Sequence, residues 1–192
     1  MAAASAVLAC SVGAGAGGAR AGIIGCGGQT LVQPFVRWLD PASYVLLGNG
    51  ALESTQGWTL AGGAKLFSGN EPWHVNSAND SHALSLPSGS SATSPALCVT
   101  LLHPDLRFFG VNSGSTLATL RVDAITTVLG LRVTTPIGLL VAGSSWQPTL
   151  PLPFLDNLLA ATQGTVQFRF TPVGAGSGWR IDDVYVDPFK SR

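Results

Sequence analysis

The stretch VQFRF at residues 166–170 alternates apolar and polar side chains without interruption. A period of two places successive side chains on opposite faces, which is typical of a β-strand with one face in the core. The stretch LRVDA at residues 120–124 repeats the alternation. Both stretches are therefore predicted to be half-buried β-strands.

Further short apolar segments surround these two strands. They lie at residues 58–67, 82–86, 92–99, 106–112, 132–142 and 179–186. Turn signals such as Gly62-Gly63 separate them. Several short strands at this spacing predict an all-β sandwich or barrel. One short helix is expected over residues 154–161, where leucines after Pro153 fall on one face.

The composition limits the class of protein. The chain has 192 residues, 10 basic and 10 acidic side chains and a net charge of zero, which argues against a basic nucleic-acid footprint. Hydrophobic residues make up 46%, which argues against disorder. No apolar run in the folded part approaches the ~20 residues of a membrane span. We expect one monomeric domain over residues 29–192, with its core at about 44–188 and an extended lead-in at 29–43.

Residues 1–28 are small and apolar apart from Arg20. This pattern, with small side chains at Ala19 and Ala21, is typical of a secretory signal peptide, although the usual basic start is missing. We therefore expect a signal peptide or disordered leader and a secreted or cell-surface protein. A lipid anchor on Cys10 is the alternative way of export.

Removal of the leader at Ala21 would leave two cysteines, Cys26 and Cys98. An even pair in an exported chain predicts one disulfide. Closing so long a loop would stabilise the fold by roughly 4 kcal/mol in the chain-entropy description. The alternative is a buried free thiol at Cys98 and a mobile Cys26.

The sequence contains little that indicates catalysis. Its three histidines, His74, His82 and His103, have no metal-ligand spacing to one another or to a cysteine or glutamate. It has no Gly-x-Ser-x-Gly elbow and no phosphate-binding loop. Nothing places its two glutamates, Glu53 and Glu71, across a cleft. We therefore expect a protein that is not an enzyme.

One acid has an unusual predicted position. In the segment 179–186, strand alternation places Asp182 on the same face as Val184 and Val186, which predicts a buried carboxylate. A lone buried carboxylate is costly and requires a donor or a cation. Backbone N–H groups near the turn after Gly178 are one solution, and a hard cation such as Ca²⁺ is the other.

Two segments resemble exported jelly-roll modules of the galactose-binding-like kind, which include several carbohydrate-binding module families. LGNGALE at residues 47–53, followed by Gly57-Trp58, is similar to their opening N-G-x-F-E … G-W signature. WRIDDVYV at residues 179–186 is similar to their closing I-D-D-V-x-V strand. The resemblance implies a jelly roll of two antiparallel sheets. The mature chain also resembles a group of exported actinobacterial proteins, which indicates no activity.

The resemblance further implies a structural calcium ion. In many such modules the opening Glu and the closing Asp bind Ca²⁺ together with backbone carbonyls, and the matching positions are Glu53 and Asp182. Leu52 stands where these modules usually have Phe, which alters packing but not the ligands.

A sugar site is also implied, because such modules stack sugar rings on exposed aromatic side chains. Trp73 lies in a polar segment with His74, Asn76 and Asp80 and is the candidate platform. In the alternative interpretation Trp73 closes one end of the sandwich. The remaining tryptophans are expected in the core, at Trp58, Trp146 and Trp179, or against the lead-in, at Trp38.

Three functions compete. The favoured one is an exported non-catalytic binding module for carbohydrate or cell-surface ligands. The alternative is a structural or adhesive envelope protein that acts through protein–protein contacts, which would show as an exposed apolar patch. An enzyme on a jelly-roll scaffold is least favoured, although the fold alone does not exclude one.

Overall fold

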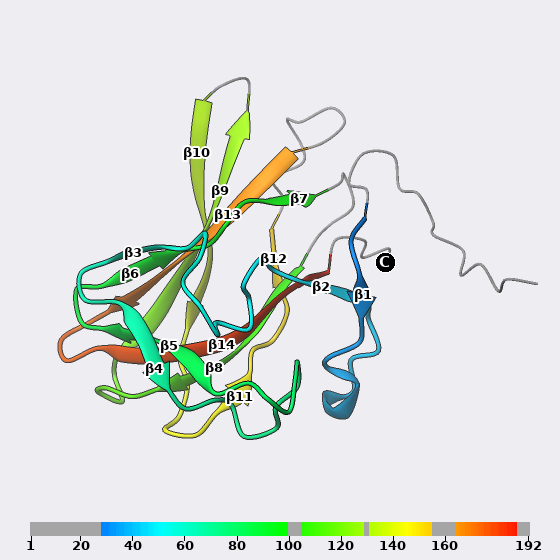
Figure 1. The fold of residues 1–192 in the computed structure, drawn as a ribbon. Coiled ribbons are helices and arrows are strands. Elements are labelled where there is room, and N and C mark those ends of the chain that lie inside the picture. The colour runs from blue at the N-terminus through cyan, green and yellow to red at the C-terminus, as the bar shows by residue number, and fades with distance from the viewer. Residues whose placement is uncertain (1–27, 100–104, 129–130, 155–163, 188–192) are drawn as a thin grey trace, which may run out of the picture.

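The computed structural model describes residues 28–99, 105–128, 131–154 and 164–187. These residues form two antiparallel sheets that pack face to face as a β-sandwich (Figure 1). The all-β, two-sheet prediction is therefore confirmed. The expected helix at 154–161 lies almost wholly outside the described residues, within which the helical element is one 3₁₀ turn, η1 (Val36–Trp38).

Each sheet combines strands from distant parts of the chain. The first sheet has the order β1 (Leu31–Val32), β2 (Tyr44–Leu46), β14 (Gly178–Asp187), β5 (His82–Pro87) and β4 (Lys65–Ser68), and β8 (Asp105–Asn112) joins β14 to β11 (Gln147–Pro148) and β12 (Leu152–Pro153). The second sheet has the order β10 (Leu131–Leu140), β9 (Thr119–Val128), β13 (Gly164–Val173), β6 (Ser91–Thr93) and β3 (Thr59–Ala61), and β7 (Leu97–Val99) pairs with β13.

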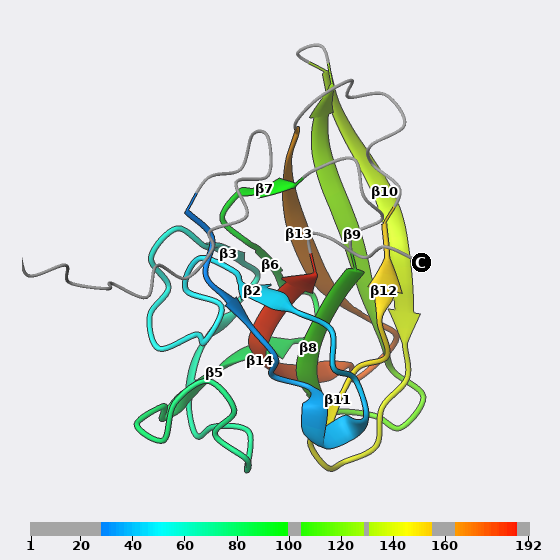
Figure 2. The same ribbon diagram turned by 90° about the vertical axis from the view of Figure 1, so that its right-hand side faces the viewer.

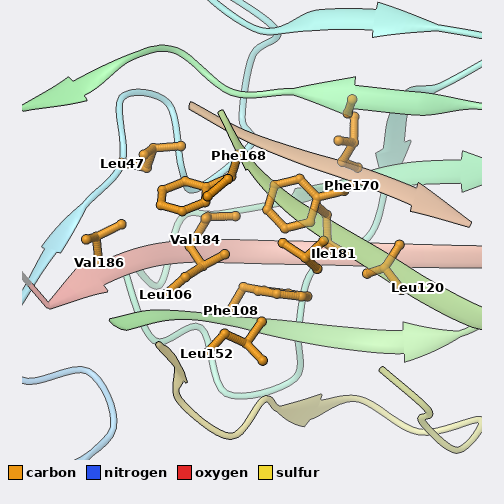
Figure 3. Packing of buried hydrophobic residues seen from close by; sticks show 14 of the residues in the cluster. Leu47, Leu106, Phe108, Leu120, Leu152, Phe168, Phe170, Ile181, Val184 and Val186 are labelled. Atoms are coloured by element: carbon orange, nitrogen blue, oxygen red, sulfur yellow. The ribbon is translucent and has the colours of Figure 1, made fainter. Parts of the chain in front are cut away.

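The core between the sheets is built from the alternating strands. Figure 3 shows Phe168 and Phe170 of β13 facing Phe108 of β8. All three rings are fully buried, and burying such a side chain contributes about 1.5–3 kcal/mol. Trp58 and Trp179 lie in the same core, as predicted. The period-two alternation thus identified the buried faces of β9 and β13 correctly.

Strand β14 contains an irregularity that alternation could not reveal. Its register against β8 shifts between Asp182 and Tyr185, and Asp183 has a left-handed φ of 47°. As a result Ile181 and Val184, three positions apart, both pack in the main core. Asp182 instead pairs with Phe109, outside that core. The prediction that Asp182 shares the face of the valines is wrong, although its burial is confirmed.

A second aromatic cluster covers the outer face of the first sheet. Its buried members, here called the outer cluster, are Phe35, Tyr44, Phe109 and Tyr185. Trp38, Trp73 and Trp146 are partly buried against it. Trp38 therefore packs the lead-in on the sandwich as predicted, whereas Trp146 belongs to this outer layer and not to the main core.

The lead-in, with β1 and η1, runs along this side of the sandwich (Figure 2). An ion pair as well as aromatic rings fix it to the outer face. The Arg107 guanidinium lies 4.0 Å from the Phe35 ring centroid and pairs with Asp40. Asp40 also accepts a 2.6 Å hydrogen bond from the Tyr44 hydroxyl. Burial acts to raise the pKa of Asp40, but hydrogen bonds from Tyr44, the Ala42 amide and Arg107 lower it overall.

Several sequence predictions concern residues outside the described ranges. Residues 1–27 of the leader, with Cys10 and Cys26, and His103 all lie there, and so the Cys26–Cys98 pairing stays a prediction. Cys98 itself lies on β7. Within the described part of the chain, no helix has the length and apolar character needed to cross a membrane.

Candidate functional site

The four residues predicted to bind a ligand lie on one loop. Trp73, His74, Asn76 and Asp80 belong to the segment 69–81 that joins β4 to β5, here called the 69–81 loop. The loop has no regular secondary structure, so its shape depends on side chains that bind its backbone amides.

Buried carboxylates supply those contacts. Glu71 is fully buried, and its two oxygens accept the backbone N–H groups of Trp73, at 2.6 Å, and Val75. Asp182 accepts the backbone N–H of Glu71 at 3.1 Å and that of Asp183 at 2.9 Å. Backbone donors thus bind Asp182, as in one of its two predicted solutions, but they belong to Glu71 and Asp183 and not to the turn near Gly178.

Two more acids hold the second half of the loop. Asp183 Oδ2 accepts the backbone N–H of Asn76 at 3.1 Å. Glu53 Oε1 accepts the backbone N–H groups of Ser81 and His82, each at 2.7 Å, and Glu53 Oε2 lies 3.0 Å from His82 Nδ1. Acids from three separate parts of the chain therefore fix the loop that carries Trp73. Sequence reasoning missed Glu71 and Asp183 in this role.

The acids perturb one another because they are crowded and buried. Burial, followed by the charge of Asp183, raises the pKa of Asp182 to about 9. Burial, together with the charges of Glu71, Asp80 and Glu53, raises the pKa of Asp183 to about 7. For Glu53 burial also acts upward, but hydrogen bonds from His82 and Ser81 outweigh it and lower its pKa.

The structure changes which acid could face a cation. Both oxygens of Asp182 accept backbone N–H bonds, whereas Asp183 Oδ1 is buried with no hydrogen-bond partner. The acids whose charges act on Asp183 include Glu53 and Asp80. Among the described residues no three His, Cys, Asp or Glu side chains lie close enough to hold a metal by themselves. A calcium site here would need backbone carbonyls as well.

The exposure of Trp73 lies between that of an exposed sugar platform and that of a ring buried at one end of the sandwich. Trp73 is partly buried, with its ring centroid 5.0 Å from that of Trp38 and 5.5 Å from that of Phe109. His74 is exposed and has a left-handed φ of 50°. The Asn76 side chain donates to Asp80 at 2.8 Å. The four predicted residues therefore share one loop, and the printed contacts join Asn76 to Asp80 and Trp73 to the aromatic rings of Trp38 and Phe109.

The fold has known structural relatives. A TM-score of 0.52 and 13% identity relate the chain to the CBM22-1 xylan-binding domain from Paenibacillus barcinonensis, over 79% of this chain and 97% of that one. The CBM22-1–GH10 modules of a Clostridium thermocellum endo-1,4-β-D-xylanase, complexed with xylohexaose, also give 0.52, with 14% identity, 71% of this chain and 27% of that one. No family model matches the sequence, and no curated protein matches it. At these identities the likeness shows the shared sandwich fold.

Proposed function

We propose that this protein is a non-catalytic carbohydrate-binding module that presents Trp73 and its loop to a glycan. The observation that carries the proposal is the anchoring of the 69–81 loop by Glu71, Asp182, Asp183 and Glu53. A tryptophan fixed before binding loses little conformational freedom when a sugar ring stacks on it. The xylan-binding function of the structural relative also supports a carbohydrate as the ligand.

Three partly exposed tryptophans extend this surface. Trp38, Trp73 and Trp146 all pack against the outer cluster and retain some exposure. A glycan chain could contact more than one of them, while Asn76 and Asp80 supply polar groups on the same loop as Trp73. The ligand proposed for this surface is a neutral polysaccharide such as xylan.

The test is retention of the full chain on neutral polysaccharides, compared between the wild type and Trp73→Leu. Leucine keeps apolar volume against Phe109 but has no ring for a sugar to stack on. Leu117→Ala, at a side chain 90% exposed between β8 and β9, is the matched control. Loss of retention only in Trp73→Leu supports the proposal. Equal retention by a folded Trp73→Leu contradicts it.

A second function is favoured by one edge of the second sheet. On β10, Leu131 and Leu139 are 71% and 64% exposed, and Val133 is also exposed. The β9–β10 hairpin extends beyond the neighbouring strands (Figures 1 and 2). An apolar edge strand suits a structural role through protein–protein contact. Self-association of the full chain that disappears in Leu131→Lys would support this function over a monomeric binding module.

We also propose that the loop anchors hold a structural calcium ion. Asp183 Oδ1 and Glu53 are the side chains that would contribute, together with backbone carbonyls. A divalent cation would offset the repulsion among these carboxylates. The proposal replaces Asp182 with Asp183, because the two oxygens of Asp182 already accept backbone bonds.

Export remains part of the proposed function. The small, apolar leader and the Cys26–Cys98 pair both suit a secreted or cell-surface protein. Mass spectrometry of the secreted chain, alkylated without reduction, would show whether Cys26 and Cys98 are joined. Free thiols at both positions would contradict the disulfide.

A further inference from the structure

The outer faces of the two sheets differ. On the first sheet, the lead-in and the 69–81 loop cover the face through the outer cluster. On the second sheet, a surface hollow of about 360 Å³ opens over β9, β13 and the β5–β6 turn. Its lining includes Ser90, Ser91, Arg121, Asp123, Arg169 and Thr171. This volume lies within the roughly 300–1,000 Å³ usual for small-ligand sites.

A bridged pair of arginines forms the floor of the hollow. Asp123 and Arg169 are directly opposed in the β9–β13 register. Arg121 Nε lies 2.8 Å from Asp123 Oδ1, and Arg169 donates to Asp123 Oδ2 at 3.2 Å. The Asp123 side chain is only 2% exposed, whereas those of Arg121 and Arg169 are 45% and 38% exposed. The carboxylate therefore orients two guanidiniums that remain open to solvent.

Both guanidiniums retain donors for a ligand. A guanidinium carries five N–H donors, and Asp123 takes one from each arginine. Because two guanidiniums pair with a single carboxylate, the three side chains together keep a net positive charge. Arg132 of β10, which donates to Gln167 Oε1 at 3.4 Å, adds a third guanidinium to the same face. A chain with zero net charge thus concentrates positive charge on this face.

On β9 and β13 this face lacks the rings that stack on neutral sugars. The residues of β9 and β13 that alternate with the core positions are Thr119, Arg121, Asp123, Ile125, Thr127, Thr165, Gln167, Arg169, Thr171 and Val173. None of them is aromatic, so recognition here would rest on charge and hydrogen bonds. Paired guanidiniums suit a carboxylate, which can accept two parallel N–H bonds from one arginine.

We propose that this hollow binds the carboxylate of a uronic acid residue in an acidic polysaccharide. Arg121 and Arg169 bind the carboxylate, and the hydroxyl groups of Ser91 and Thr171, which line the same hollow, bind sugar hydroxyls. The inference rests on the proposed carbohydrate-binding function, but it assigns a second ligand class to the face opposite Trp73.

The test measures binding of the full chain to oligogalacturonides by calorimetry, at about 0.15 M salt so that weak surface charge effects are screened. The carboxyl-reduced form of the same oligosaccharides is the neutral comparison. We expect Arg169→Gln to weaken oligogalacturonide binding about ten-fold, since it removes a charged hydrogen-bond donor. Arg37→Gln, which removes an exposed arginine from the lead-in, is the matched control and should bind as the wild type does.

A triple variant removes both arginines without leaving an unpaired buried charge that could unfold the protein. Removing both arginines would leave the buried Asp123 carboxylate without a partner, so Arg121→Gln and Arg169→Gln are combined with Asp123→Asn. A folded triple variant should lose oligogalacturonide binding and keep any Trp73-dependent retention on neutral polysaccharide. Unchanged oligogalacturonide binding by the triple variant overturns the inference.

The remaining outcomes separate this inference from the proposed function. Retention of neutral polysaccharide without oligogalacturonide binding overturns the inference alone. Failure to bind any glycan overturns both. Equal affinity for polyglutamate also overturns the inference, because it would show ion exchange without recognition of the sugar.

Discussion

Asp183 Oδ2 accepts a hydrogen bond from the backbone N–H of Asn76 at 3.1 Å, across 107 positions of sequence. The contact joins β14, the last strand in the sequence, to the loop that carries Trp73. It exists because the bulge in β14 gives Asp183 a left-handed backbone and turns Asp182 toward the outer face. The loop and the final strand therefore form one unit.

The Glu71 carboxylate is predicted to be required for the stability of that unit. Glu71→Ala removes the acceptor of two backbone N–H groups, and an unsatisfied buried donor costs about 1–3 kcal/mol. We expect the free energy of unfolding to fall by about 3 kcal/mol in urea denaturation. Glu71→Gln keeps one oxygen acceptor and should lose less. Equal stability of wild type and Glu71→Ala would contradict the anchoring role.

The raised pKa values of Asp182 and Asp183 predict a specific pH dependence. In the folded state these groups hold protons up to about pH 9 and about pH 7, whereas unfolded aspartate releases its proton near 3.8. The folded state thus binds more protons over this range, and stability falls as pH rises. At acid pH the lowered pKa values of Asp40 and Glu53 act in the opposite direction, because protonating these carboxylates costs stability.

The measurement for this prediction is the denaturation midpoint between pH 5 and pH 9 in a chelator. The midpoint of the wild type should decline with rising pH in this range, following the two raised pKa values. Asp182→Asn should flatten the decline, since it removes the carboxyl with the higher pKa. A wild-type midpoint that rises across this range would exclude the assignment.

Calcium is predicted to stabilise the wild type through Asp183. At a concentration 100 times its Kd, a ligand that binds only the folded state adds about 2.7 kcal/mol. Thermal melts with calcium and with chelator should differ in the wild type and in Asp182→Asn, and should coincide in Asp183→Asn. A response lost in Asp182→Asn and kept in Asp183→Asn would restore the ligand that the sequence alone suggested.

The lead-in is predicted to be part of the folded domain. Phe35 is fully buried and contacts Tyr44, Phe109 and Tyr185, so Phe35→Ala should cost about 3–5 kcal/mol. Leu39, four residues later, is 95% exposed, and Leu39→Ala should change stability by less than about 0.5 kcal/mol. Urea denaturation of both variants measures the difference. Equal small effects would mean that the lead-in is dispensable.

Local sequence patterns were sufficient to predict which face of each alternating strand is buried. They were insufficient to predict the contacts of the candidate site. The alternation at residues 166–170 and 120–124 correctly identified Phe168, Phe170 and Val122 as core. The burial of Asp182 was predicted correctly but for the wrong reason, because the face it was expected to share with Val184 and Val186 is not the one it occupies. The direction of its side chain was not predictable, because a single bulge reverses the faces of every residue that follows.

Alternation of side-chain character is a property of neighbouring residues, so the all-β class and the buried side of most strands are already determined in the sequence. Partnership between distant groups is decided only when the sheets form. Glu71 meets Asp182 across 111 positions, and Arg169 meets Asp123 across 46. Strand register and one bulge bring these charges together, and neither has a signal in any single segment. The tertiary structure therefore decided which acids anchor the loop and which arginines share a face.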